Sequence, residues 1–408
     1  MAVPLNISLG ELNLVNAAAQ SVAVLTIVLL LPAAIAGDFI VRRPGSAMRL
    51  LVLAFALSSA ISWLAVTVQR GFAFGALLSV VNWVALGGLV ILGQVLLADA
   101  SRLRFALSCW VGVQAITAAA AVTYLLAVFG LDLFLADSRG PFQLAMQAIL
   151  PNWPNGSGLV FATSACLAYG QLRGGERSPF LRLALVTLVI GTLVTFSRAA
   201  WLACFGGLVV ITMVGTRLTR SLPTLVGLLI VTGLVASQVP TVRYQVQRTL
   251  TPGSSEQISV LQRVAFGIEA FRLWREHPVV GIGFARFTDY ASLARLSAMG
   301  PARADYVPGS VHNEYLSILL KGGLLSAVTF LLFIWRTLRH HRRLASSKAP
   351  SLELRSSGIA GLGIVTALLV GGLGGESFRQ VSISAPYWLL AGALSVLGRH
   401  SASRTSTV

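Results

Sequence analysis

Apolar segments long enough to cross a membrane recur along the chain, and they limit its possible folds more than any other feature. A transmembrane helix needs about 20 mostly apolar residues to cross ~30 Å of hydrocarbon. Windows of this kind lie near 14–37, 50–68, 73–97, 105–130, 156–171, 180–196, 199–215, 221–239, 312–336, 357–374 and 384–398. They predict an all-α polytopic membrane protein with about eleven helices, or twelve if the half-length stretch at 141–155 also crosses. The windows 180–196 and 199–215 are either two spans with a tight turn or one broken segment.

The composition excludes a soluble enzyme. Hydrophobic residues make up 55% of the chain, charged residues only 11%, and the mean hydropathy is +0.79. Soluble domains carry about 25% charged residues. The net charge of +17 would suggest nucleic acid in a soluble chain. Here the basic residues follow apolar segments, so we expect contacts with membrane lipids and no nucleic-acid partner.

Short loops that are rich in Lys and Arg stay on the cytoplasmic side, so the distribution of these residues predicts the orientation. Most of them fall on one side, whereas the short connections of the other side hold only Arg70, Arg139, Arg198 and Arg379. With eleven spans, the C-terminus is expected in the cytoplasm and the N-terminus outside. The predicted parts are N-terminal helices at 1–239, an extracytoplasmic loop domain at 240–311, C-terminal helices at 312–398 and a cytoplasmic tail at 399–408.

The long extracytoplasmic loop is predicted to contain an amphipathic helix near the outer membrane surface. Residues 262–276 place apolar side chains at helical spacing, with an arginine-rich opposite face. Pro278 is expected to end this helix, and Gly281 and Gly283 to supply a turn. A nucleotide-binding loop is not expected there, because no third glycine follows at the required spacing and no strand precedes it.

His312 is the first candidate for chemistry, since it stands at the outer end of a predicted span. An imidazole titrates near neutral pH and can take a proton from a hydroxyl group. The alternative is an interfacial histidine that caps a helix and bonds lipid headgroups. The polar neighbours Asn313 and Glu314 favour a functional site, because polar groups at this depth cost free energy.

Arg198 and Arg263 are candidate phosphate ligands on the same side of the membrane. A guanidinium stays charged, and its planar fork of donors suits phosphate oxygens. The alternative for each is an ordinary snorkelling or headgroup-binding arginine. With His312 they would place a diphosphate leaving group beside a general base, and Arg286 of the same loop is a possible lining residue. No metal site is expected, because the chain has no H-E-x-x-H and no acidic pair spaced for magnesium.

Lys321 and Arg379 are further possible lining residues. On a continuous helix Lys321 would lie ~13 Å deeper than His312 and roughly on the opposite face, with Glu314 as a possible partner. Arg379 and Glu376 share a short outer loop. They either pair with each other or line the cavity.

Three ordered groups of residues resemble the O-antigen ligase family. The first is the string TFSRAAWLA at 195–203. The second lies in the long loop and comprises Gln262-Arg263 and the string HPVVGIG at 277–283. The third is VHNEYL at 311–316, followed by KGG at 321–323. Their order, their predicted side of the membrane and the long loop between them carry the resemblance.

The resemblance implies a metal-independent, inverting glycosyltransferase without a cofactor, on the periplasmic face of a bacterial inner membrane. Its donor would be a glycan on undecaprenyl diphosphate, and its acceptor a sugar hydroxyl of lipid A–core in lipopolysaccharide biosynthesis. By the matched positions, Arg198 and Arg263 would bind the diphosphate and His312 would activate the acceptor hydroxyl.

Alternatives to the ligase remain open from the sequence. The shared strings do not separate ligases from O-antigen polymerases, exopolysaccharide polymerases or protein O-oligosaccharyltransferases. The ligase is the first choice because the spacing of the arginines, the loop and the His-Asn-Glu string look like the ligase pattern. A membrane transporter is the alternative from another class, suggested by Lys321 and by glycine-rich segments, although the chain shows no internal repeat.

Overall fold

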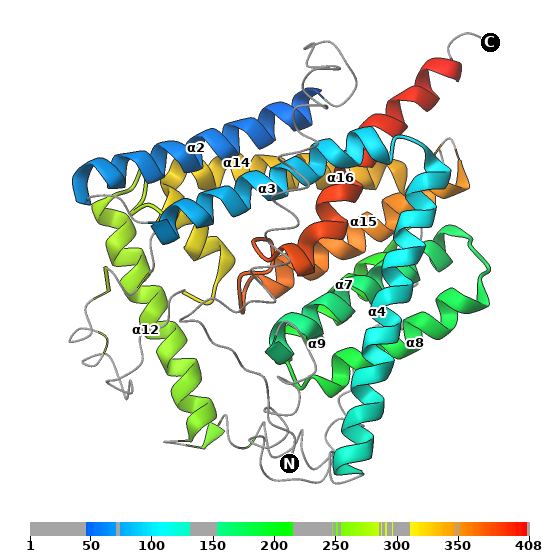
Figure 1. Cartoon of the computed structure of the whole chain (residues 1–408), viewed down its shortest axis with the longest axis horizontal. Coiled ribbons are helices and arrows are strands. Elements are labelled where there is room, and N and C mark those ends of the chain that lie inside the picture. Colours follow the sequence, from blue (N-terminus) through cyan, green and yellow to red (C-terminus); the bar gives the residue numbers. More distant parts are fainter. Residues whose placement is uncertain are drawn as a thin grey trace.

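The structure of the chain is a computed structural model (Figure 1). It describes residues 46–70, 74–130, 153–214, 254–284, 311–346 and 351–405, together with isolated positions between these ranges. Regular secondary structure in this part of the chain is helical, and none of it is a strand. The predicted all-α polytopic membrane fold is therefore confirmed.

The described helices agree with the predicted apolar windows wherever the two can be compared. The windows at 14–37 and 221–239 and most of the stretch at 141–155 lie outside the described residues. The windows 180–196 and 199–215 form two separate helices joined by a short turn. The helices are α2 (Ser46–Arg70), α3 (Phe74–Leu96), α4 (Ala100–Phe129), α7 (Trp153–Gly174), α8 (Pro179–Val194), α9 (Arg198–Met213), α12 (Ser255–Glu276), α14 (Glu314–Leu344), α15 (Leu352–Gly371) and α16 (Val381–Thr405).

Five of the described helices, α2, α3, α4, α14 and α15, are long and apolar enough to cross a membrane. The helices α8 and α9 and the first part of α16 are apolar but shorter. Large apolar side chains cover the outer faces of the long helices, for example Leu57 of α2 and Phe105 of α4, which are 63% and 72% exposed. Such surfaces are stable against lipid chains, which are as apolar as the side chains themselves.

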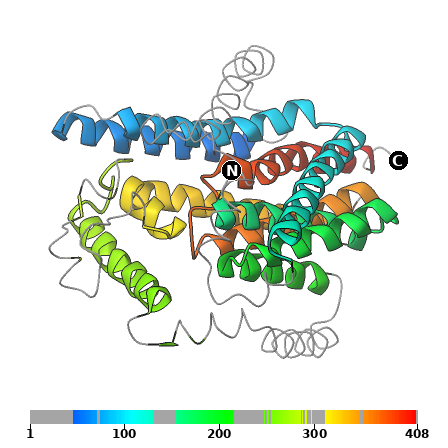
Figure 2. The ribbon, with the colours of Figure 1, turned by 60° about the horizontal axis from the view of Figure 1, so that its bottom comes forward.

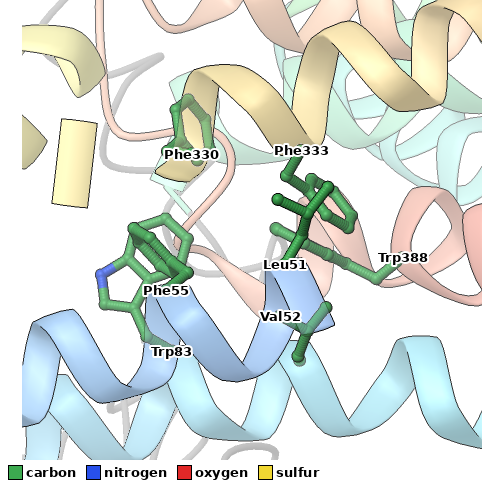
Figure 3. Close-up of a pocket in the computed structure, with 8 residues that line it drawn as sticks. Leu51, Val52, Phe55, Trp83, Phe330, Phe333 and Trp388 are labelled. Atoms are coloured by element: carbon green, nitrogen blue, oxygen red, sulfur yellow. The ribbon is translucent and has the colours of Figure 1, made fainter. Parts of the chain in front are cut away.

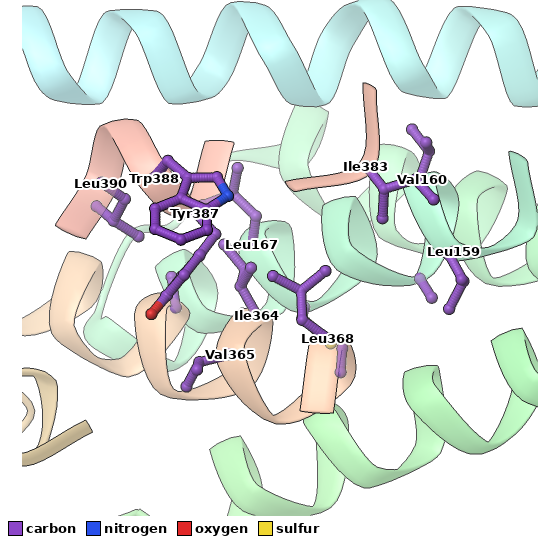
Figure 4. Packing of buried hydrophobic residues seen from close by; sticks show 14 of the residues in the cluster. Leu159, Val160, Leu167, Ile364, Val365, Leu368, Ile383, Tyr387, Trp388 and Leu390 are labelled. Atoms are coloured by element: carbon purple, nitrogen blue, oxygen red, sulfur yellow. The ribbon is translucent and has the colours of Figure 1, made fainter. Parts of the chain in front are cut away.

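The centre of the bundle is α15, which packs against α7 and α9 on one side and α14 on another. Figure 2 shows α2 and α3 on one side of the molecule and α8 and α9 on the other, with α14, α15 and α16 between them. Small residues allow this close packing, as is common in membranes. A Cβ atom on Gly170 of α7 would lie only 2.3 Å from Cα of Ala360 in α15. Figure 4 shows the apolar layer that α7, α15 and α16 share around Tyr387.

Aromatic side chains fill the contact between α2, α3, α14 and α16. Phe55 and Trp83 meet edge to face with ring centroids 5.0 Å apart, and Phe333 and Trp388 stack at 4.9 Å. These rings and Phe330 line a small apolar pocket (Figure 3). Each ring buries a large apolar area, so the cluster fixes α14 against three neighbouring helices.

The amphipathic helix predicted in the long loop exists as α12, and it begins seven residues earlier than expected. It packs on α14 and lies across the direction of α2 and α14 (Figure 1). Its apolar residues divide between two faces, which differs from the single face predicted. Ala265 and Leu273 are buried against the loop and α14, whereas Val264, Ile268 and Phe271 are exposed.

Candidate functional site

Arg198 is the first residue of α9, and the turn before it presents the side chain at a helix N-terminus. The Ser197 hydroxyl caps the helix by accepting a hydrogen bond from the Ala200 amide at 3.3 Å. Phe196 has a left-handed backbone with φ of 50°, which is uncommon for a residue with a side chain. The Arg198 side chain is exposed. A helix N-terminus with a guanidinium favours an anion at this position.

His312 lies outside α14, although the sequence suggested that it begins the helix. Its backbone is left-handed, with φ of 56°. The helix starts two residues later, and Asn313 caps it by accepting a hydrogen bond from the Leu316 amide at 3.0 Å. The helical projection that put Lys321 on the face opposite His312 therefore does not apply, because the chain turns between the two residues.

Hydrogen bonds with the loop between α15 and α16 hold Asn313 and Glu314, the two residues that follow His312. The Glu314 amide donates to the Gly372 carbonyl at 2.8 Å, and Asn313 Nδ2 donates to the Leu373 carbonyl at 3.3 Å. In return, the Phe378 amide donates to Glu314 Oε2 at 2.9 Å. The Glu314 side chain is buried, with 1% of the residue exposed.

The HPVVGIG segment at 277–283 follows α12 and contacts α14 at a break in that helix. Gly323 has φ of 64°, so the helical hydrogen bonds are interrupted there. The Ile282 amide donates to the Leu320 carbonyl and the Leu324 amide to the Pro278 carbonyl, both at 2.9 Å. A Cβ atom on Gly323 would lie 2.2 Å from the Val279 carbonyl oxygen. Glycine is therefore required for this contact, and the string that did not fit a nucleotide loop has a structural role.

Three separate elements converge at this end of the bundle. A Cβ atom on Gly374 would lie 3.1 Å from Cβ of Ala199, so the α15–α16 loop contacts the start of α9. A Cβ atom on Gly267 of α12 would lie 3.6 Å from Leu316 of α14. Arg263 is one helical turn before Gly267 and falls on the same flank of α12. The contacts at Gly374 and Gly267 therefore bring the N-terminal ends of α9 and α14 close to the side of α12 that carries Arg263.

The charges of the gathered residues act on one another. Burial and the nearby Arg198 guanidinium lower the pKa of Arg263. Burial and Arg263 lower the pKa of His312 below 6.5, against the opposing effect of Glu376. Two guanidinium groups that repel each other can be stabilised by an anion between them. A lowered pKa favours the neutral imidazole, which is the form that accepts a proton.

A buried ionic network lies beside His312. Glu376 accepts a hydrogen bond from Ser317 Oγ at 2.7 Å, pairs with Arg379, and has Oε1 3.7 Å from Lys321 Nζ. Burial alone would raise the pKa of Glu376, but Arg379, Lys321, Ser317 and His312 together lower it to about 2. The carboxylate is therefore ionised, and it supplies negative charge close to the imidazole.

The structure brings together most of the candidate residues. Arg198, Arg263 and His312 interact electrostatically, and Asn313 and Glu314 hold the backbone beside His312. Lys321 pairs with Glu376 instead of the Glu314 expected as a possible partner, and Arg379 pairs with Glu376. Lys321 and Arg379 therefore belong to the buried ionic network beside His312. Arg286 lies outside the described residues.

Sequence reasoning did not anticipate how central Glu376 is. The only signal was an acidic residue in a short, glycine-rich outer loop, Gly374-Gly375-Glu376. Its partners come from α14 and from its own loop, and no spacing in the sequence relates positions 317, 321 and 376. Within the described part of the chain, no group of three or more His, Cys, Asp or Glu side chains is arranged to hold a metal ion.

These features define a polytopic all-α membrane protein that gathers two arginines and a histidine at one end of its helical bundle. Comparison with protein families matches residues 183–331 to the family described as O-antigen ligase. Over these residues the chain is similar to that family, which confirms the resemblance predicted from the sequence. The match contains Arg198, Arg263 and His312, whereas Glu376 and Arg379 lie beyond it. The curated proteins compared with the chain gave no match.

Proposed function

We propose that the protein is an O-antigen ligase. It transfers a glycan from undecaprenyl diphosphate to a sugar hydroxyl of lipid A–core on the periplasmic face of the bacterial inner membrane. The observation that carries this proposal is the convergence of Arg198, Arg263 and His312 from three separate elements. The family match supports the reaction class, which is glycan transfer from a lipid-linked donor.

The proposed chemistry is an inverting displacement at the anomeric carbon. His312 takes the proton of the acceptor hydroxyl, whose oxygen attacks the anomeric carbon as the bond to the diphosphate breaks. Arg198 and Arg263 bind the diphosphate and stabilise the charge that develops on it, helped by the N-terminus of α9. A lipid diphosphate is a good leaving group, so the residues act by positioning and electrostatics, without a metal.

The proposed orientation follows from the ends of α15. Its last turn contacts Glu314 beside the candidate site, and its first turn holds Glu353, which pairs with Arg104 at 3.3 Å. Arg104 is one of the arginines predicted to be cytoplasmic. It therefore lies at the end of α15 that is away from the site. The C-terminus is then cytoplasmic and the site periplasmic.

A polymerase of the same superfamily is the second candidate, because the same three residues suit the same donor. The two reactions differ only in the acceptor. The test is a detergent-solubilised, purified protein given the undecaprenyl-diphosphate glycan with lipid A–core and with free donor as competing acceptors. A His312-dependent adduct on lipid A–core supports the ligase, and a ladder of longer undecaprenyl-linked glycans supports the polymerase. Absence of both products in folded protein argues against glycan transfer, and activity that persists in EDTA supports the metal-independent step.

A further inference from the structure

The left-handed backbone of His312 needs an explanation in the surrounding structure. A residue with a side chain seldom adopts φ near 56° unless its neighbours hold it there. The residues that follow His312 are bonded to the α15–α16 loop, which lies about sixty residues further along the chain. That loop must therefore stay in place for the imidazole to keep its position.

Glu314 makes the side-chain contact that secures this arrangement. Its main-chain amide donates to the Gly372 carbonyl, and its Oε2 accepts from the Phe378 amide, so one residue bonds both ends of the loop. The space around it is tight, since a Cβ atom on Gly372 would lie 3.2 Å from Cβ of Glu314. Phe378 is itself fully buried and meets the Phe330 ring edge to face at 5.2 Å.

The loop that Glu314 holds also carries Glu376, the carboxylate whose charge acts on His312. The two bonds of Glu314 thus fix the backbone beside the imidazole and the loop that faces it. From this geometry we infer that Glu314 is a positioning residue for His312, and that it works through the hydrogen bond from the Phe378 amide. The catalytic part of this inference rests on the proposed function.

Two substitutions separate the hydrogen bond from the carboxyl group. Glu314→Asp keeps the carboxyl group but is one methylene too short to reach the Phe378 amide. Glu314→Gln replaces the carboxyl group but keeps a carbonyl oxygen at the same reach. A positioning role through the hydrogen bond predicts that Asp is the more damaging change, and a role of the carboxyl group itself predicts the opposite order.

The first measurement is the rate at which diethyl pyrocarbonate modifies His312 in the full-length protein, followed by mass spectrometry of the peptides. It requires no substrate, so it tests the positioning even if the proposed reaction is wrong. His341 of α14 is fully buried and serves as the internal control for folding. We expect a several-fold faster modification of His312 in Glu314→Asp, the wild-type rate in Glu314→Gln, and unmodified His341 in both.

Asn82→Ala is the matched control, because Asn82 Nδ2 donates to the Arg379 carbonyl of the same loop at 2.7 Å. This variant loses one loop hydrogen bond without touching Glu314, and we expect His312 to react as in the wild type. An unchanged rate in Glu314→Asp overturns the inference. So does faster modification in Glu314→Gln than in Glu314→Asp, or an Asn82→Ala variant as reactive as Glu314→Asp.

The second measurement is transfer activity. With the base misplaced, kcat of Glu314→Asp should fall by on the order of 100-fold while KM for the donor and for the acceptor stays unchanged. Glu314→Gln should restore most of kcat. An equal rise of KM in both variants contradicts a positioning role. A wild-type protein without transfer activity would reject the proposed function and leave the modification result valid.

Discussion

The Lys321 ammonium lies 3.7 Å from the Glu376 carboxylate, and both side chains are almost completely buried. Lys321 stands beside the break in α14, and Glu376 lies in the loop that faces His312. The pair therefore connects the broken helix to the candidate site. An ion pair of this kind contributes little net stability, but removal of one partner leaves a costly buried charge.

Glu376→Gln should be strongly destabilising, because it leaves Lys321 buried without its anion. We expect a loss of about 3 kcal/mol or more in the free energy of unfolding. Lys321→Met should cost less, since Glu376 still pairs with Arg379. The measurement is the thermal unfolding of the three variants and the wild type in the same detergent. The double variant Lys321→Met/Glu376→Gln should be more stable than Glu376→Gln alone, and a strictly additive loss would show that the two groups do not interact.

His312→Ala should abolish transfer, because it removes the imidazole that takes the proton of the acceptor hydroxyl. The protein level and the unfolding temperature should stay close to those of the wild type, since the His312 side chain is only partly buried. Product formation is followed with the lipid-linked glycan donor. Transfer at the normal rate in this variant would reject His312 as the base.

The pH profile of transfer should reflect the lowered pKa of the His312 imidazole. The neutral imidazole is the active form, so activity is lost as pH falls through the pKa of His312, which lies below 6.5. Arg263 is one cause of the depression. In Arg263→Gln the pKa should rise, and the acid limb of kcat/KM should move to higher pH. An acid limb that stays in place would show that Arg263 does not act on His312.

Arg198→Lys should lose most of the activity although it keeps the positive charge. A lysine cannot offer the two parallel donors with which a guanidinium binds phosphate oxygens. Transfer rates and KM for the donor are measured in Arg198→Lys and Arg198→Ala. Wild-type turnover in Arg198→Lys would mean that the site needs only a point charge.

Gly323→Ala should destabilise the junction between α12 and α14. The new Cβ atom would lie 2.2 Å from the Val279 carbonyl oxygen, at a residue with φ of 64°. The backbone strain alone costs about 1–3 kcal/mol. Gly375→Ala is the matched control, because a Cβ atom there meets no atom within 4 Å. Thermal unfolding of the two variants should show a large loss for the first and little change for the second, and equal stabilities would contradict the required contact.

The sequence alone determined the class of the protein and the residues most open to chemistry. Apolar windows predict helices because a membrane leaves backbone groups no partner except one another. Each window within the described ranges forms a helix, and five of these helices are long and apolar enough to cross a membrane. His312 and Arg198 could be selected because a charged or titratable side chain at the end of an apolar segment is costly without a role. Arg263 could be selected because its guanidinium lies in the long loop on the same side of the membrane.

Only the tertiary structure decided how these residues are held. Helical spacing placed Lys321 opposite His312, but the left-handed turn at His312 takes that residue off the helix. The pairing of Lys321 with Glu376 and the bond from Phe378 to Glu314 join residues more than fifty positions apart. Periodicity describes neighbours on one element, whereas these contacts depend on how α14 packs against the α15–α16 loop. The sequence therefore identified the candidate residues, and the packing of separate helices determined their partners.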